Sequence, residues 1–228
     1  MNVRKSHVAG TDGIRIVIVD DHPIVRQGIK MLAAAEPDLV VCGEAENAAE
    51  ALQTIGRSNP DVAIVDLSLK EGSGLELIKD IKNRYPKLLV LVLSMRNESF
   101  YAERVLRAGA RAYITKEEGA ERVIEGIRKI LEGKIYLSER MASKVITKWV
   151  DGKTDSRAPS VAKLSDRELE VFELLGSGLS TRQIAGKLHI SVKTVESHRE
   201  HIKEKLEINR AAELLKHAIR WVQFQEQG

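Results

Sequence analysis

The feature that most constrains the fold is a fivefold alternation of strand-like and helical patterns in the first 132 residues. Apolar runs rich in β-branched residues lie at 14–19, 39–43, 62–65, 88–93 and 111–115. Helical periodicity follows them at about 23–35, 47–57, 73–84, 98–108 and 119–132. Strand, helix and strand in repetition require right-handed crossovers, which produce a parallel sheet with helices on both faces. We therefore predict a flavodoxin-like α/β domain of five strands in the order 2-1-3-4-5.

Acidic side chains follow two strands that are neighbours in this order. Asp20 and Asp21 end the first strand, and Asp66 ends the third. Because the carboxyl ends of parallel strands meet at one edge of a sheet, we expect the three carboxylates to lie together. Carboxylates in one place repel each other unless a cation or a proton holds them. The pattern predicts a Mg²⁺-assisted phosphoryl-acceptor site at Asp66 that controls the C-terminal part of the chain.

Two further polar residues end strands in the same scheme. Ser94 follows the fourth strand and Lys116 the fifth. At the same edge, Lys116 and Mg²⁺ would balance the charge of a phosphoryl group, and Ser94 would donate to one of its oxygen atoms. Taken singly, Asp21 and Ser94 are better explained as helix caps, and Lys116 as a solvated strand end. Five such residues at one edge favour the phosphoryl site.

These positions carry a resemblance to a known family. The segments Ile16–Asp21 and Tyr113–Lys116, with Asp66 and Ser94, resemble the signature of response-regulator receiver domains over about residues 14–132. The resemblance implies that Asp66 accepts a phosphoryl group from a histidine kinase. It further implies that Mg²⁺ is held by Asp20, Asp21, Asp66 and the Ser68 carbonyl, and that the switch and phosphoryl-binding residues are Ser94, Tyr113 and Lys116.

The sequence departs from the receiver pattern at two places. Leu69-Lys70 stand where receivers often have Met-Pro, and Glu117 stands where a proline often follows the lysine. A cis peptide before Glu117 is not expected, because the cis form is costly before a residue other than proline. Tyr113 also has an alternative to the switch role, as an amphipathic strand-edge residue with its ring buried and its hydroxyl in water.

Composition excludes several classes of protein. A single cysteine cannot build a disulfide framework, or a zinc site by itself. No apolar run approaches the roughly 18 residues of a membrane helix, and residues 1–13 lack the apolar segment of a signal peptide, so we expect a cytoplasmic protein with no membrane partner. The net charge of +3 does not by itself indicate nucleic acid, so a DNA-binding prediction must rest on pattern.

The C-terminal third has only helical periodicity, at 165–175, 181–189, 192–206 and 210–224. Ser165 and Glu168 have the spacing of a capping box, and Ser191 is placed to cap the third helix. The second and third helices, joined by a tight turn, form a helix-turn-helix whose outer face is polar and cationic, as a helix in the major groove requires. A plain four-helix interaction domain with a solvated charged face is the alternative.

A second resemblance favours DNA binding. The segments Leu164–Val171, Gln183–Ala185 and Ile190–Arg199 resemble the LuxR-type helix-turn-helix. With the receiver in front, the whole chain resembles a NarL/FixJ-type response regulator, whose last helix would pair two copies on an inverted repeat of double-stranded DNA. The resemblance implies DNA contacts by Lys193, Thr194, Ser197 and Arg199, with support from Arg182, His198 and Lys203.

We therefore predict four parts: a flexible leader at 1–13, a receiver at 14–132, a linker with a short helix at 133–162, and a LuxR-type DNA-binding domain at 163–228. The predicted protein is a transcription regulator and not an enzyme, in which phosphorylation at Asp66 controls homodimerisation and sequence-specific DNA binding. One alternative is a DNA-binding regulator whose receiver docks independently of phosphorylation. Another is a metal-dependent phosphohydrolase with Asp66 as nucleophile, for which the sequence offers no second general acid.

Overall fold

The computed structural model describes residues 13–69, 71–151 and 160–226. The predicted leader therefore lies outside the described residues except for Gly13, and so do residues 152–159 of the predicted linker. The C-terminal end of that linker contains the short 3₁₀ helix η1 (Ser160–Lys163). None of the helices in the described ranges is long and apolar enough to cross a membrane.

The first domain contains the predicted five-stranded parallel sheet. Its strands are β1 (Ile14–Val19), β2 (Leu39–Ala45), β3 (Val62–Val65), β4 (Leu89–Ser94) and β5 (Ala112–Thr115). They pair in the order β2-β1-β3-β4-β5, which confirms the predicted order. β1 and β3 are direct neighbours, with Val19 opposite Val65, so the residues that follow both strands begin at the same edge.

Five helices cover the two faces of this sheet. They are α1 (Pro23–Ala35), α2 (Ala48–Ser58), α3 (Gly74–Arg84), α4 (Glu98–Ala108) and α5 (Ala120–Leu131). Successive side chains of a strand point to opposite faces of the sheet, so alternate residues belong to two different hydrophobic cores. Ile16 and Ile18 pack with apolar residues of α1 and α5, whereas Val17 and Val19 pack with those of α2, α3 and α4.

The predicted linker helix is α6 (Glu139–Asp151), and it is attached to the first domain at its N-terminal end. The Ser138 hydroxyl accepts from the Met141 N–H at 3.1 Å, which satisfies one of the free donors of the first turn. The Ser138 N–H donates to Glu98 at the start of α4 at 3.0 Å, and the Ser138 hydroxyl contacts the same carboxylate. The linker therefore begins against α4.

The C-terminal domain is all-helical, with α7 (Asp166–Gly176), α8 (Thr181–Leu188), α9 (Val192–Leu206) and α10 (Ala211–Glu226). The predicted capping box of Ser165 and Glu168 is present, and Ser191 caps α9 through the N–H of Thr194. Ile184 and Leu188 of α8 pack with Val195 and Ile202 of α9 in one core. Val192, the first residue of α9, is 40% exposed.

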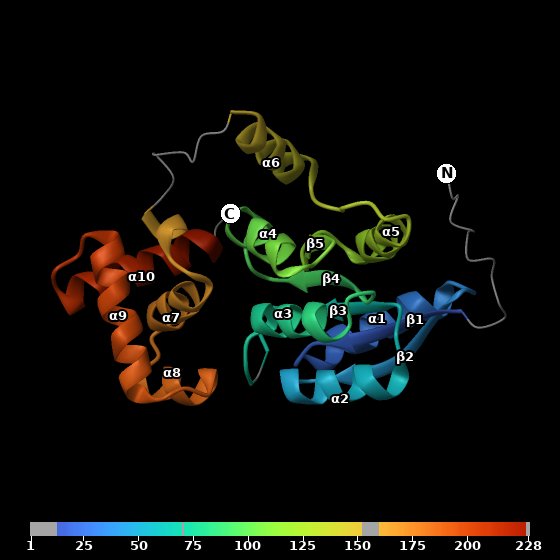
Figure 1. Ribbon diagram of the computed structural model, residues 1–228, viewed down its shortest axis with the longest axis horizontal. Helices are drawn as coiled ribbons and strands as arrows, with labels where there is room; N and C mark the ends of the chain where they lie inside the picture. Colours follow the sequence, from blue (N-terminus) through green and yellow to red (C-terminus); the bar gives the residue numbers. More distant parts are fainter. Residues whose placement is uncertain (1–12, 70, 152–159, 227–228) are drawn as a thin grey trace.

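The C-terminal domain lies beside α3 and α4 of the first domain (Figure 1). Helix α7 faces the first domain, and ion pairs join Asp166 of α7 to Lys79 of α3 and to Arg104 of α4. The face of α9 that carries Lys193 and Thr194 is exposed in this arrangement. The two domains are therefore docked, with the predicted DNA-contacting face uncovered.

Candidate functional site

The three predicted carboxylates lie together at the carboxyl edge of the sheet. Asp20 and Asp66 are each 2% exposed, because the parallel strands β1 and β3 deliver them side by side and the following loops cover them. One oxygen atom from each of Asp20, Asp21 and Asp66, and one ring nitrogen of His22, all lie within 4.8 Å of one another. Such a group of buried negative charges requires positive charge nearby.

Lys116 supplies that positive charge. Its Nζ lies 2.7 Å from an oxygen of Asp20 and 2.7 Å from an oxygen of Asp66, and its side chain is 10% exposed. Burial works against the charged form, but the charge and hydrogen bonds of Asp66 and Asp20 outweigh it, so the pKa of Lys116 is raised above its ordinary value. Lys116 therefore stays cationic at neutral pH and joins the two buried carboxylates.

The second oxygens of Asp20 and Asp66 accept hydrogen bonds from the chain that follows each strand. Asp66 Oδ1 accepts from the Ser68 N–H at 3.1 Å, and Asp20 Oδ1 accepts from the His22 N–H at 2.8 Å. The ring of His22 lies 2.8 Å from Asp21 as well. We did not predict His22, although its place directly after the two aspartates was a signal in the sequence. The set of oxygen donors is of the kind that a hard divalent cation prefers.

Ser94 and Tyr113 lie on the adjacent strands β4 and β5 and meet through a third residue, Arg96. Ser94 is fully buried and is the last residue of β4, not the residue after it, and its hydroxyl accepts from the Arg96 N–H at 3.4 Å. The Tyr113 hydroxyl donates to the Arg96 carbonyl at 2.7 Å. Tyr113 is 1% exposed, and burial raises the pKa of its hydroxyl well above the ordinary value. The alternative in which this hydroxyl lies in water is wrong.

The side chain of Arg96 extends across the edge of the site. Its Nε donates to the Ser68 hydroxyl at 3.1 Å, and its Nη1 donates to the Tyr101 hydroxyl at 2.6 Å. The guanidinium also lies over the Tyr101 ring, 4.9 Å from its centroid, and forms an ion pair with Glu173 of α7. Burial opposes the charge, but Tyr101 and Glu170 outweigh it, so the pKa of Arg96 is raised. No pattern in the sequence indicated this residue.

The Lys116–Glu117 peptide is trans, as is every other peptide bond in the described part of the chain. This agrees with the expectation for a glutamate where receivers often have proline.

The predicted DNA-contacting residues fall into two groups. Lys193, Thr194 and Ser197 are exposed at the N-terminal half of α9, and Arg182 is exposed on α8. Thr194 is held in place by Ser191, whose hydroxyl accepts from the Thr194 N–H at 3.0 Å and lies 2.7 Å from its hydroxyl. These side chains form a polar surface at the start of the helix, where a recognition helix meets base edges.

Of the other three predicted residues, two already have partners within the domain and one is partly buried. Arg199 donates to the Thr181 hydroxyl at 2.7 Å, so it joins α9 to the start of α8. Lys203 pairs with Glu200 at 2.7 Å on the same helix. His198 is half-buried, and burial together with the nearby Arg167 charge lowers its pKa. His198 is therefore more readily neutral than a free histidine.

A receiver-like sheet with an acidic edge, followed by a helix-turn-helix domain, defines a class of proteins: the two-component response regulators that bind DNA. Family models agree with this class. The model described as "Response regulator receiver domain" matches residues 16–128, and the model described as "Bacterial regulatory proteins, luxR family" matches residues 162–218.

Similar proteins cover nearly the whole chain. The oxygen regulatory protein NreC of Staphylococcus carnosus (strain TM300) is 36% identical over 211 residues, which cover 91% of this chain and 97% of that protein. NreC of Staphylococcus haemolyticus (strain JCSC1435) is 35% identical over 211 residues, with the same coverage. The chain belongs to the NarL/FixJ-type response regulators.

Solved structures give the same result. The RcsB response regulator of Salmonella typhimurium has a TM-score of 0.70 and 28% identity, and the match covers 92% of this chain and 98% of RcsB. A structure of RcsB from Salmonella enterica serovar Typhimurium, bound to promoter P1flhDC in the presence of phosphomimetic BeF₃⁻, has a TM-score of 0.67 and 28% identity, with coverage of 91% and 98%. The architecture of both domains is therefore shared with RcsB.

Proposed function

We propose that a histidine kinase phosphorylates this chain at Asp66 and that phosphorylation controls dimerisation and sequence-specific binding of double-stranded DNA. The observation that carries the proposal is the buried Asp66 carboxylate, with Lys116 at 2.7 Å and Asp20 beside it. An oxygen of Asp66 would form the new bond to phosphorus while the bond from phosphorus to the donor's histidine nitrogen breaks. Lys116 would then bind an oxygen of the transferred group, because its ammonium is already directed at Asp66.

The residues at this edge fit a Mg²⁺ ion. Asp20, Asp21, Asp66 and the Ser68 carbonyl would hold it, since they offer the oxygen ligands that Mg²⁺ prefers. When bound, the ion supplies positive charge that stabilises the phosphoryl group during transfer. Ser94 and Tyr113 would respond to the transferred group, because both are joined to the backbone of Arg96 at the end of β4.

The C-terminal domain, which we assign to 163–228 after a receiver at 14–132 and a linker at 133–162, would bind DNA through the start of α9. Lys193, Thr194 and Ser197 are exposed there, Arg182 is exposed on α8, and Arg199, His198 and Lys203 would give support. The last helix, α10, exposes Leu215, Ile219 and Phe224, which are candidates for the contact between two copies. RcsB is described both bound to a promoter and as dimers on DNA, which supports this assignment. Such a regulator would act in the cytoplasm.

The test compares one sample before and after treatment with acetyl phosphate and Mg²⁺. We expect the mass in solution to change from monomer towards dimer, and DNA affinity to rise about tenfold, within the range typical of coupling between two sites. Light scattering and DNA-binding titrations at fixed salt measure the two quantities. Equal affinity and equal mass in both states would support a phosphorylation-independent docking receiver instead.

Lys193→Ala tests the DNA surface separately. We expect weaker DNA binding. The slope of the logarithm of the binding constant against the logarithm of salt concentration should fall in magnitude by about one, because a lysine that contacts a phosphate releases about one counterion. Lys87→Ala is the matched control, since Lys87 is an exposed lysine of the receiver and its removal changes the net charge equally. DNA titrations over a series of salt concentrations measure the slope. The assignment of α9 to DNA fails if the two variants lose the same affinity.

A further inference from the structure

One face of α7 is acidic and is directed at the receiver. Asp166, Glu170 and Glu173 are spaced at i, i+4 and i+7, so they lie on one side of the helix. We call these three residues the α7 acidic face. Each has a partner in the receiver: Asp166 binds Lys79 and Arg104 at 2.9 and 2.8 Å, and the remaining contacts are Ser73–Glu170 and Arg96–Glu173.

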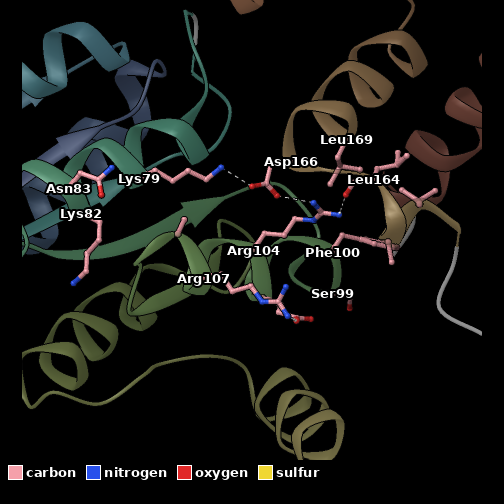
Figure 2. Close-up of a pocket in the computed structure, with 14 residues that line it drawn as sticks. Lys79, Lys82, Asn83, Ser99, Phe100, Arg104, Arg107, Leu164, Asp166 and Leu169 are labelled. Carbon is pink, nitrogen blue, oxygen red and sulfur yellow. Dashed lines mark hydrogen bonds and ion pairs between the residues drawn. The ribbon is translucent and has the colours of Figure 1, made fainter. Parts of the chain in front are cut away.

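The interface is polar and incompletely packed. Figure 2 shows Lys79 and Arg104 converging on Asp166, while Arg104 also donates to the Leu164 carbonyl at 2.8 Å. A cavity of about 650 Å³ lies between these elements, lined by residues of α3, α4, η1 and α7. An interface that depends on ion pairs around a cavity is of the kind that separates readily.

An aromatic contact completes the interface at α10. The Trp221 ring lies 5.3 Å from the Phe100 ring of α4 and 5.7 Å from the Phe172 ring of α7, measured between centroids. The indole Nε1 is buried and has no hydrogen-bond partner among the described residues. Docking therefore fixes the second half of α10 against the receiver while the start of α9 stays exposed.

Arg96 connects this interface to the acidic edge of the sheet. Its Nη1 forms an ion pair with Glu173, which is 8% exposed, and its Nε donates to the Ser68 hydroxyl at 3.1 Å. The N–H of the same serine donates to Asp66 Oδ1 at 3.1 Å. The guanidinium is thus linked to the acceptor carboxylate through one residue and to α7 directly.

We propose that Arg96 is a positioning residue that exchanges between two anions: Glu173 of α7 when Asp66 is unmodified, and the phosphoryl group when Asp66 is phosphorylated. This inference rests on the proposed phosphorylation of Asp66. A phosphoryl group has a charge of about −1.5 to −2 and three acceptor oxygens, and a guanidinium binds such a group at two points. Glu173 then loses its cation in a buried position, which is unfavourable, so α7 leaves the receiver. Separation releases Trp221 of α10 from Phe100 of α4, so that α10 can approach another copy.

The test follows Trp221 fluorescence in the full chain. Trp149→Phe in every sample makes Trp221 the single tryptophan. We call this single-tryptophan chain the parent. With acetyl phosphate and Mg²⁺, we expect its emission maximum to move to longer wavelength, because the contact of Trp221 with Phe100 is lost and the indole becomes exposed to water. Glu173→Gln should give the same shift without phosphodonor, and Glu213→Gln, the same chemical change at an exposed position of α10, should give none.

A charge exchange tests the competition itself. Arg96→Glu combined with Glu173→Arg keeps an ion pair across the interface but removes the cation at position 96 of the receiver. We expect this variant to dock and, compared with the parent at the same measured extent of Asp66 labelling, to show no shift. A shift equal to that of the parent would overturn the role of Arg96, and so would a Glu173→Gln variant that stays docked until it is phosphorylated.

Labelling measured on the same samples separates this inference from the proposed function. A parent that is never labelled contradicts phosphorylation at Asp66, and with it the exchange. A parent that is labelled and does not shift contradicts the exchange alone.

Discussion

The Asp66→Asn variant should lose Mg²⁺-dependent labelling by acetyl phosphate completely. An amide cannot displace the leaving group at phosphorus, whereas the carboxylate of Asp66 can. The variant should fold, because asparagine has nearly the same volume as aspartate. Its side-chain oxygen can still accept from the Ser68 N–H, which lies 3.1 Å from Asp66 Oδ1 in the unaltered chain. Incubation with radiolabelled acetyl phosphate, followed by electrophoresis, measures the incorporated phosphate. Loss of labelling should be accompanied by loss of the phosphodonor-induced changes in mass and DNA affinity.

Asp80→Asn is the matched control for this change. Asp80 lies half-buried on α3 and belongs to neither the acidic edge nor the α7 interface, so labelling should stay at the level of the unaltered chain. Persistent labelling in Asp66→Asn would place the acceptor elsewhere, with Asp20 and Asp21 as the nearest carboxylates. That outcome would contradict the site and leave the family assignment unchanged.

The sheet order and the acidic edge could be predicted because both follow from local patterns. Alternating strands and helices permit few topologies, and the direction of parallel strands decides where the residues after them lie. The helix caps were predictable for the same reason, since Ser165 and Ser191 bond to residues three positions later. Each of these interactions depends on a short stretch of chain.

The interdomain contacts could not be predicted in this way. Ser73 and Glu170 are separated by 97 positions in the sequence and lie in different domains. Their contact depends on how two finished domains pack, and neither helix has a pattern that specifies the other. Arg96 was missed for the same reason, and so was the contact of Arg199 with Thr181, which joins two helices through side chains alone.

Under the proposed function, exposure of α9 in the docked arrangement does not by itself amount to an active regulator. The start of α9 is exposed while α7 and α10 are held against the receiver. A single DNA-binding domain makes few base contacts, and pairing of two copies on two half-sites supplies the rest of the affinity and specificity. Control of pairing would therefore be sufficient for the proposed control of DNA binding, with no need to cover the recognition helix.

Lys116→Ala should lower the free energy of unfolding by about 3 kcal/mol in the absence of Mg²⁺. The change removes the cation that lies 2.7 Å from both Asp20 and Asp66, each 2% exposed, and leaves two buried carboxylates uncompensated. Mg²⁺ should recover more stability in this variant than in the unaltered chain, because a bound cation replaces the missing charge and binding stabilises the folded state. Urea titrations with Mg²⁺ and with a chelator measure both quantities.

Lys134→Ala is the control, because Lys134 also pairs with a carboxylate, that of Glu132, but does so on the surface with a side chain that is 61% exposed. An exposed pair contributes little to stability, so this variant should unfold at nearly the urea concentration of the unaltered chain. Similar losses in the two variants would contradict a special role for Lys116. An equal gain of stability from Mg²⁺ in Lys116→Ala and in the unaltered chain would contradict a metal site next to the lysine. The acidic edge would then bind Mg²⁺ with the same affinity whether or not the ammonium is present.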